Sequence, residues 1–244
     1  MVRPWSNQEI RDSGEPLIAL PDQLYRLEPH PYKQLGAPYG LDGDPFKLRQ
    51  GVVNRLLTAQ GCLQQICPQI RLAVFDGWRP LAVQAFMVDY AINQQCVIRG
   101  IDRDDQRSNQ VLGEIIDEVG RFWAPPSSDP LTPPPHSTGA AVDLTLADLE
   151  GTPLTMGGEI DDIGPMSEPN AYSDASRSNS GSPEAVWHQR RSWLACSMRS
   201  AGFAQHPNEW WHFSFGDQLW CWLSGGQFAI YGALSDSSSI DLIN

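Results

Sequence analysis

The segment HSTGAAVDLTL, residues 136–146, predicts a turn that leads directly into a buried strand. Gly139 permits the turn because glycine adopts backbone conformations that other residues avoid. The run AAVDLTL, residues 140–146, is apolar on both sides of Asp143, which is typical of a short buried strand. A charged carboxylate in such surroundings needs a partner. We therefore predict that His136 and Asp143 lie together and hold one ion.

A second histidine group lies in EWWH, residues 209–212, where Glu209 is three residues before His212. Two imidazoles and one carboxylate are a common catalytic zinc set, in which water takes the fourth position. A second carboxylate that does not bind the metal can then accept a proton from that water. Residues i and i+3 of a regular strand point to opposite faces, so we expect Glu209 at a strand entrance or a bulge. Taken singly, each histidine is more often a structural residue than a ligand.

Arginine and tryptophan side chains in these motifs have both a functional and a structural interpretation. Arg79 lies in DGWRP, residues 76–80, directly after the apolar strand RLAVF. A guanidinium held by such a rigid turn suits the stabilisation of an oxyanion in a transition state. The structural alternative is a salt bridge between Arg79 and Asp76. Trp210 and Trp211 are candidates for substrate contact, but aromatic pairs on a strand more commonly belong to the core.

The spacing of apolar residues predicts four helices and several strands, which together favour an α+β fold. The expected helices cover Lys47 to Ile66, a stretch beginning at Pro80 and including Ile92, Arg107 to Phe122, and Pro183 to Ser200. The expected strands are residues 71–75 and 140–146, followed by two or three antiparallel strands in EWWHFSF (209–215), LWCWL (219–223) and FAIYG (228–232). Turn-forming residues predict a loop-rich segment over residues 1–45 and a mobile surface loop over residues 164–182.

Composition narrows the class of protein. With 244 residues, of which 41% are hydrophobic, the chain can bury a core, and we expect one domain over residues 1–244. The formal net charge of −12 disfavours a nucleic-acid partner, because an acidic surface repels phosphate. No run approaches the roughly 18 apolar residues that cross a bilayer. The N-terminus has no apolar stretch of signal-peptide length, so we expect a cytoplasmic protein. The five cysteines are scattered, which predicts free thiols.

In combination, the motifs DGWRP, HxxGxAxD and EWWH resemble those of the D-alanyl-D-alanine dipeptidases of the VanX type, over about residues 45–215. These enzymes share a zinc fold with D,D-carboxypeptidases and the hedgehog N-terminal domain. The resemblance implies a mostly antiparallel central sheet flanked by helices, one Zn²⁺ per chain, and hydrolysis of a small dipeptide to free D-alanine. It assigns zinc binding to His136, Asp143 and His212, the role of general base to Glu209, and stabilisation of the tetrahedral intermediate to Arg79.

The resemblance also extends to PLTMGGEID, residues 153–161, where an aspartate of the family helps to hold the free amino group of the substrate. Asp161 is the matching residue. A dipeptidase needs an anion there, because each of its substrates carries an ammonium group. The alternative is that Asp161 belongs to a solvated acidic loop. Pro134 and Pro135 stand where the family has serines, so a polar contact to the substrate has to come from elsewhere.

Two other functions fit the same motifs. The first is a D,D-carboxypeptidase that trims peptidoglycan stem peptides with the same zinc chemistry. The second is a non-catalytic binding module that contains zinc for structure. The EWWH motif and the absence of a wall-binding repeat favour the dipeptidase, and the presence of both Glu209 and Arg79 favours an enzyme. The sequence makes no prediction about the oligomeric state.

Overall fold

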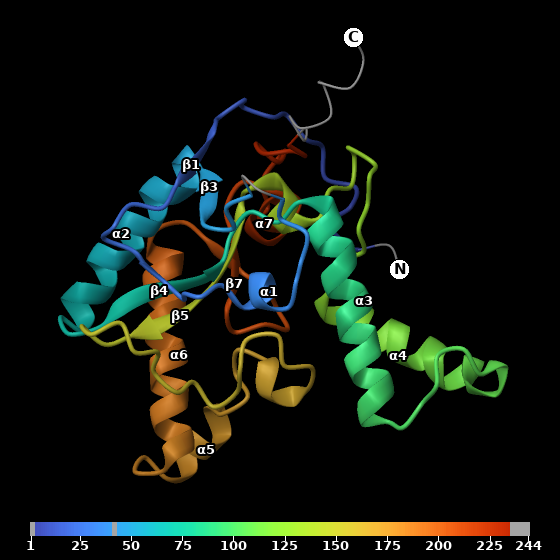
Figure 1. Ribbon diagram of the computed structural model, residues 1–244. Helices are drawn as coiled ribbons and strands as arrows, with labels where there is room; N and C mark the ends of the chain where they lie inside the picture. Colours follow the sequence, from blue (N-terminus) through green and yellow to red (C-terminus); the bar gives the residue numbers. More distant parts are fainter. Residues whose placement is uncertain (1–2, 41–42, 235–244) are drawn as a thin grey trace.

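The computed structural model describes residues 3–40 and 43–234 (Figure 1). Its α-helices are α1 (Pro31–Gln34), α2 (Gln50–Ile66), α3 (Leu81–Ile98), α4 (Asn109–Phe122), α5 (Ser173–Ser178), α6 (Pro183–Ser200) and α7 (Gln218–Ser224). Short 3₁₀ helices are η1 (Gln106–Ser108), η2 (Pro135–Thr138) and η3 (Pro165–Ser167). The strands are β1 (Leu17–Ala19), β2 (Tyr25–Arg26), β3 (Lys47–Arg49), β4 (Arg71–Asp76), β5 (Ala141–Ala147), β6 (Ala204–Gln205) and β7 (His212–Ser214). What the sequence predicts for residues 1, 2, 41, 42 and 235–244 lies outside the described residues.

The central sheet has five strands in the order β2-β4-β5-β7-β6. Only the β2–β4 pair is parallel, and the other three pairs are antiparallel. A separate two-stranded sheet joins β1 to β3. Helices flank the central sheet, as Figure 1 shows. The prediction of an α+β fold with a mostly antiparallel central sheet is therefore confirmed.

Alternation along the central strands separates an apolar face from a polar one. Val142 and Leu144 of β5 and Phe213 of β7 are fully buried in the main core, which α2 and α6 complete. The intervening residues Asp143 and His212 belong to the opposite face, because successive side chains of a strand point to opposite sides. The strand pattern thus holds the candidate metal ligands away from the core that stabilises the sheet.

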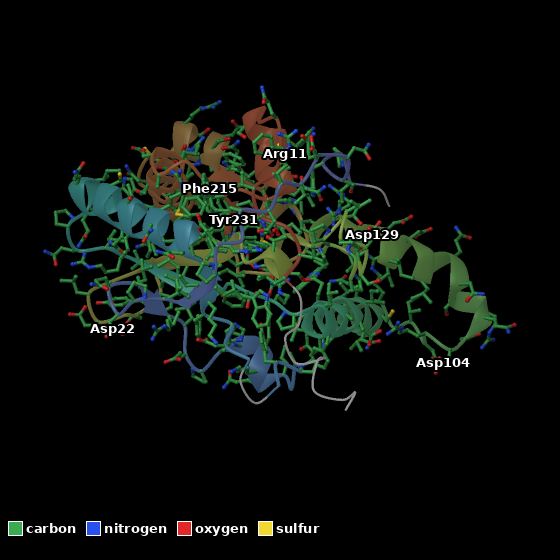
Figure 2. The ribbon with its side chains drawn as sticks, turned by 90° about the horizontal axis from the view of Figure 1, so that it is seen from above. Arg11, Asp22, Asp104, Asp129, Phe215 and Tyr231 are labelled. Carbon is green, nitrogen blue, oxygen red and sulfur yellow. The ribbon has the colours of Figure 1, made fainter. Side chains whose placement is uncertain are left out.

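Helices α3 and α4 form a hairpin with a core of its own. Figure 1 shows the hairpin on the side of the molecule away from α2. Val83 and Ile115 are buried inside it, and Phe75 of β4 packs against the same cluster. Asp104 lies at the tip of the connecting loop, away from Phe215 and Tyr231 of the main core (Figure 2). The hairpin therefore forms one wall beside the polar face of the sheet.

Two predictions of secondary structure are wrong in part. Residues 47–49 belong to a strand, and the helix predicted from Lys47 begins at Gln50. The physical reason is pairing with a distant strand, since Leu48 lies opposite Ile18 of β1. The helical spacing of Leu48 therefore reflects its burial rather than its backbone conformation.

The C-terminal strands are also fewer than predicted. LWCWL lies in helix α7, because the side chain of Asp217 accepts a hydrogen bond from the Trp220 amide and Gly225 ends the helix in the left-handed conformation. FAIYG makes only an isolated bridge, between Ala229 and Ile10. EWWHFSF contains a strand, but the strand begins at His212.

Several other predictions are confirmed. Helix α6 has the predicted bounds, Pro183–Ser200, and all five cysteines are free.

The segment over residues 164–182 is predicted to be a loop but contains the short helices η3 and α5. Its mobility stays a prediction. The single domain over residues 1–244 stays a prediction as well. None of the helices in residues 3–40 and 43–234 combines the length and apolarity needed to cross a membrane.

Candidate active site

The register of the central sheet brings three polar residues into one row. Asp143 of β5 lies opposite His212 of β7 on one side and opposite Asp76 of β4 on the other. The register of β4 shifts between Val74 and Asp76, which is the irregularity of a β-bulge. Bulges re-aim side chains next to functional sites. Two carboxylates and one imidazole, from three strands that are distant in sequence, therefore meet on the polar face.

His136 reaches this row from η2. Gly139 ends η2 with φ 71°, and a Cβ atom at this position would lie 2.4 Å from the Leu17 side chain, so the turn requires glycine. The Nδ1 atom of His136 lies 2.8 Å from the Gly77 carbonyl oxygen. Since a carbonyl only accepts, Nδ1 carries the proton and Nε2 presents a lone pair. That Nε2 lies 3.2 Å from Asp143 Oδ2 and 3.2 Å from His212 Nδ1.

His136, Asp143 and His212 together have the geometry of a metal site. Their ligand atoms all lie within 4.8 Å of one another, and all three residues are buried. Asp143 Oδ1 is 3.0 Å from His212 Nδ1 but accepts no hydrogen bond from the described residues. Two imidazole nitrogens and one carboxylate oxygen are ligands that zinc prefers. These residues therefore fit a divalent cation of this class.

The charges of the three residues suit the same role. Burial opposes ionisation of Asp143, but His136 and then His212 hold the pKa of its carboxyl well below the usual value. Burial lowers the pKa of His212, with Asp143 opposing this shift. An ionised carboxylate beside a neutral imidazole is the protonation state that binds a metal ion.

Glu209 lies beside this set, at the entrance of β7 as the sequence predicts. Its side chain is buried, with Oε2 3.6 Å from His212 Nδ1 and Oε1 3.4 Å from His206 Nδ1. Oε1 has no hydrogen-bond partner among the described residues. Burial, followed by the nearby charges of Asp143 and Asp161, raises the pKa of Glu209 well above its usual value. A carboxylate with a raised pKa is a better proton acceptor, which is the requirement for a general base.

Arg79 is part of a buried network behind the ligands. Its Nε donates to Asp76 Oδ2 at 2.9 Å and its Nη1 to Gln84 Oε1 at 3.0 Å. Its Nη2 lies 3.3 Å from both Asp143 Oδ2 and the Tyr32 hydroxyl. The salt bridge between Arg79 and Asp76 is present, and the role of Arg79 in stabilising an oxyanion stays a prediction. The contact with Asp143 also places the guanidinium next to the candidate metal ligands.

Asp161 lines a pocket that the proposed metal ligands, Glu209 and Arg79 also line, so it does not belong to an isolated loop. Its Oδ2 accepts a hydrogen bond of 2.7 Å from the Tyr32 hydroxyl. It is the one described residue other than glycine with a positive φ, 71°. Burial and then the Asp143 charge raise the pKa of Asp161 to about 7. Asp161 is therefore an acidic group directed towards the pocket by a strained backbone conformation.

The pocket brings together all six candidate residues and adds several that the sequence did not indicate. Trp210 and Trp211 both belong to the main core, as the structural interpretation of this pair predicts, and Trp211 also lines the pocket. The residues missed are Arg3, Trp5, Gln84 and His206, which line the pocket, and Tyr32, which contacts Arg79 and Asp161. His206 had a weak signal, because histidines are few and it is three residues before Glu209. The others carry no local signal.

Known proteins resemble this chain over most of its length. The family model of Peptidase M15, described as D-Ala-D-Ala dipeptidase, matches residues 25–229. A D-alanyl-D-alanine dipeptidase of Synechocystis sp. is 42% identical over 228 residues, which cover 91% of this chain and 90% of that protein. A D-alanyl-D-alanine dipeptidase of Escherichia coli is 34% identical over 100 residues, which cover 37% of this chain and 47% of that protein.

A solved structure is also similar in its chain path. It is a mutant of VanY, a vancomycin-resistance D,D-pentapeptidase, in complex with Zn(II). The TM-score is 0.47 at 12% sequence identity, and the match covers 88% of this chain and 90% of that one.

Proposed function

The chain belongs to the D-Ala-D-Ala dipeptidase family of metallopeptidases, and from this we propose that it hydrolyses D-alanyl-D-alanine to two molecules of D-alanine. The observation that carries the proposal is the convergence of three buried ligand atoms, from His136, Asp143 and His212, beside the carboxylate of Glu209. The relatives are peptidases, which argues against a non-catalytic zinc-containing module.

We assign one Zn²⁺ per chain to His136, Asp143 and His212. The support comes from their donor atoms, from the unprotonated Nε2 of His136 and from Oδ1 of Asp143, which accepts no hydrogen bond from the described residues. When bound, zinc supplies Lewis-acid chemistry that polarises the peptide carbonyl and acidifies a water molecule. The contact of His136 Nδ1 with the Gly77 carbonyl, at 2.8 Å, fixes the orientation of the ring towards the ion.

Glu209 acts as the general base and then as the general acid. Its carboxylate accepts a proton from the attacking water, whose oxygen forms a bond to the peptide carbon. Glu209 then delivers the proton to the leaving nitrogen as the C–N bond breaks. Arg79, whose guanidinium lines the pocket and is held there by Asp76 and Asp143, stabilises the negative charge that develops on the carbonyl oxygen next to the proposed ligands.

Asp161 and Tyr32 hold the ammonium group of the substrate. The Tyr32 hydroxyl donates to one oxygen of Asp161, which orients the carboxylate and leaves its other oxygen for the ligand. A charge-assisted hydrogen bond to an ammonium group is about twice as strong as a neutral one. A longer peptide has an amide nitrogen where a dipeptide has its ammonium group. A site in which Asp161 holds an ammonium group therefore selects a dipeptide. The cytoplasmic location, the absence of a nucleic-acid partner and the role in cell-wall metabolism stay predictions.

The test is a comparison of substrates with the purified full chain. D-alanyl-D-alanine, L-alanyl-L-alanine and a longer peptide that ends in D-alanyl-D-alanine are each incubated with the protein, with and without a chelator. We expect rapid cleavage of the D,D-dipeptide, its loss on chelation and its return when zinc is added. Preferential cleavage of the longer peptide would instead identify a D,D-carboxypeptidase.

A further inference from the structure

We propose that Arg3 binds the terminal carboxylate of the dipeptide and is the residue that makes the enzyme specific for a free C-terminus. This role rests on the proposed function, since it concerns the substrate of the same site. Arg3 lies in the N-terminal segment, outside the family match, yet it lines the same pocket as His136, Asp161 and Glu209.

Neutral groups hold the Arg3 guanidinium in place. Its Nη2 donates to the Trp123 carbonyl oxygen at 2.8 Å and its Nη1 to the Arg121 carbonyl oxygen at 3.4 Å. The guanidinium also lies 5.5 Å from the centre of the Trp5 ring. Trp123 and Trp5 line the pocket as well. The side chain is therefore positioned at the pocket wall without being neutralised there.

The charge of Arg3 has no counter-ion among the described residues. No carboxylate oxygen in residues 3–40 and 43–234 lies within 4.0 Å of its guanidinium, and its buried Nε has no hydrogen-bond partner. Burial lowers the pKa of Arg3, and the nearby charge of Glu209 opposes this shift. Glu209 nevertheless forms no ion pair with Arg3. Arg3 is partly buried, and a cation that loses solvation without gaining a counter-ion is costly, so such a group usually has a ligand.

The second arginine of the pocket is in the opposite situation. Arg79 contacts two carboxylates, those of Asp76 and Asp143, at 2.7 and 3.3 Å. The contact with Asp143 assigns Arg79 to the reaction centre, so a different group has to hold the terminal carboxylate of the substrate. Among the described residues that line the pocket, Arg3 is the remaining cation.

The substrate supplies the missing anion. A dipeptide carries an ammonium group, which Asp161 suits, and a carboxylate, which needs a cationic or donor group. The chain before His136 offers little, because Pro134 and Pro135 have neither a hydroxyl group nor a backbone N–H. Arg3 and these two prolines line one continuous groove beside the site. Arg3 is thus placed to supply the contact that the prolines lack.

The experiment compares Arg3→Gln with the wild-type enzyme on D-alanyl-D-alanine and on its C-terminal amide, both with zinc bound. Loss of a charge-assisted hydrogen bond lowers kcat/KM for the free acid by about tenfold to a hundredfold, mainly through KM. The uncharged amide should be cleaved equally well by both enzymes. Arg11→Gln is the matched control, because Arg11 is an exposed arginine of the same N-terminal segment that pairs with Glu9 and does not line the pocket.

Two results would overturn the proposal. One is an unchanged KM for the free acid in Arg3→Gln, and the other is an equal loss for the acid and the amide, which identifies a structural role. If the wild-type enzyme cleaves neither compound, the proposed function fails. In that event, calorimetric binding of D-alanyl-D-alanine and its amide to the zinc-loaded protein decides the role of Arg3. Selective weakening of acid binding by Arg3→Gln supports that role, and equal binding contradicts it.

Discussion

Glu209 is the residue whose substitution should separate metal binding from catalysis. Glu209→Gln keeps the size and the hydrogen-bonding capacity of the side chain but removes its ability to accept a proton. Because general bases contribute about 100- to 10,000-fold, we expect kcat to fall by that factor while one zinc per chain is retained. Steady-state kinetics and metal analysis test this together. Glu150→Gln, at an exposed position, is the control, and substantial turnover by Glu209→Gln would remove Glu209 from the base role.

His212 should behave in the opposite way, because it is a proposed ligand. His212→Ala removes one of three donors, so zinc content after dialysis should fall well below one per chain, and hydrolysis should be lost with it. His188→Ala is the control, since His188 lies on α6 beside a different cavity. A full zinc stoichiometry in His212→Ala would contradict the ligand assignment.

Asp76 is a buried counter-ion of Arg79, so its substitution should affect stability. Its fully buried carboxylate accepts hydrogen bonds from the Tyr39 hydroxyl at 2.9 Å and from Arg79 Nε at 2.9 Å. Asp76→Asn leaves a buried guanidinium with less compensation, so we expect a loss of about 3–5 kcal/mol in the free energy of unfolding. Urea denaturation measures it. In Asp89→Asn, which removes an exposed pair with Arg103, the change should be at most about 1 kcal/mol.

At the scale of secondary-structure elements, α6 shows how a local signal defines a helix. Ser182 precedes Pro183, and its hydroxyl accepts a hydrogen bond from the Ala185 amide at 3.2 Å. Ser182→Ala should therefore lower the free energy of unfolding by about 1 kcal/mol. Ser180→Ala, two residues earlier and exposed, should have little effect. Equal stability of the two variants in urea denaturation would show that the cap contributes nothing.

The sheet illustrates a different principle, in which register creates the site. Asp76, Asp143 and His212 come from strands separated by about 70 residues each, and the antiparallel pairing places them opposite one another. A shift of one residue in β5 would turn Asp143 to the apolar face. The buried residues of β5 thus secure the register, and the register secures the ligands.

At the scale of the whole molecule, the partly buried acid Asp161 makes stability depend on pH. Its pKa is about 7 in the folded protein against a usual 3.8. A carboxyl group with a raised pKa stabilises the fold at low pH, and this contribution is lost as pH rises through about 7. Metal-free wild-type protein should therefore lose stability relative to Asp161→Asn between about pH 4 and pH 7.

Urea denaturation of the metal-free proteins at these pH values measures the difference. Asp104→Asn is the matched control for the loss of one negative charge, because Asp104 is exposed at the tip of the α3–α4 hairpin (Figure 2). A constant difference between Asp161→Asn and wild type across the range would contradict the raised pKa of Asp161.

Much of the molecule follows from local sequence. The bounds of α6, the strand that carries Asp143 and the position of Glu209 before its strand were all predicted, because periodicity, caps and turns act over a few residues. The conversion of LWCWL into α7 was missed although its signals, Asp217 and Gly225, are local. The aromatic residues of LWCWL favour a strand, whereas the residues that flank it cap a helix, and the caps decide the conformation.

The sequence by itself determined which chemical groups are available, namely the scarce histidines, the carboxylate in an apolar strand and the rigid arginine. Tertiary structure alone decided that Lys47–Arg49 pairs with β1 and that Tyr32 orients Asp161. It also decided that Arg3 shares a pocket with His136, Asp143 and His212, which follow it by more than 100 residues. The physical reason is that these contacts depend on strand register and on the docking of distant segments. No short stretch of sequence encodes either of them.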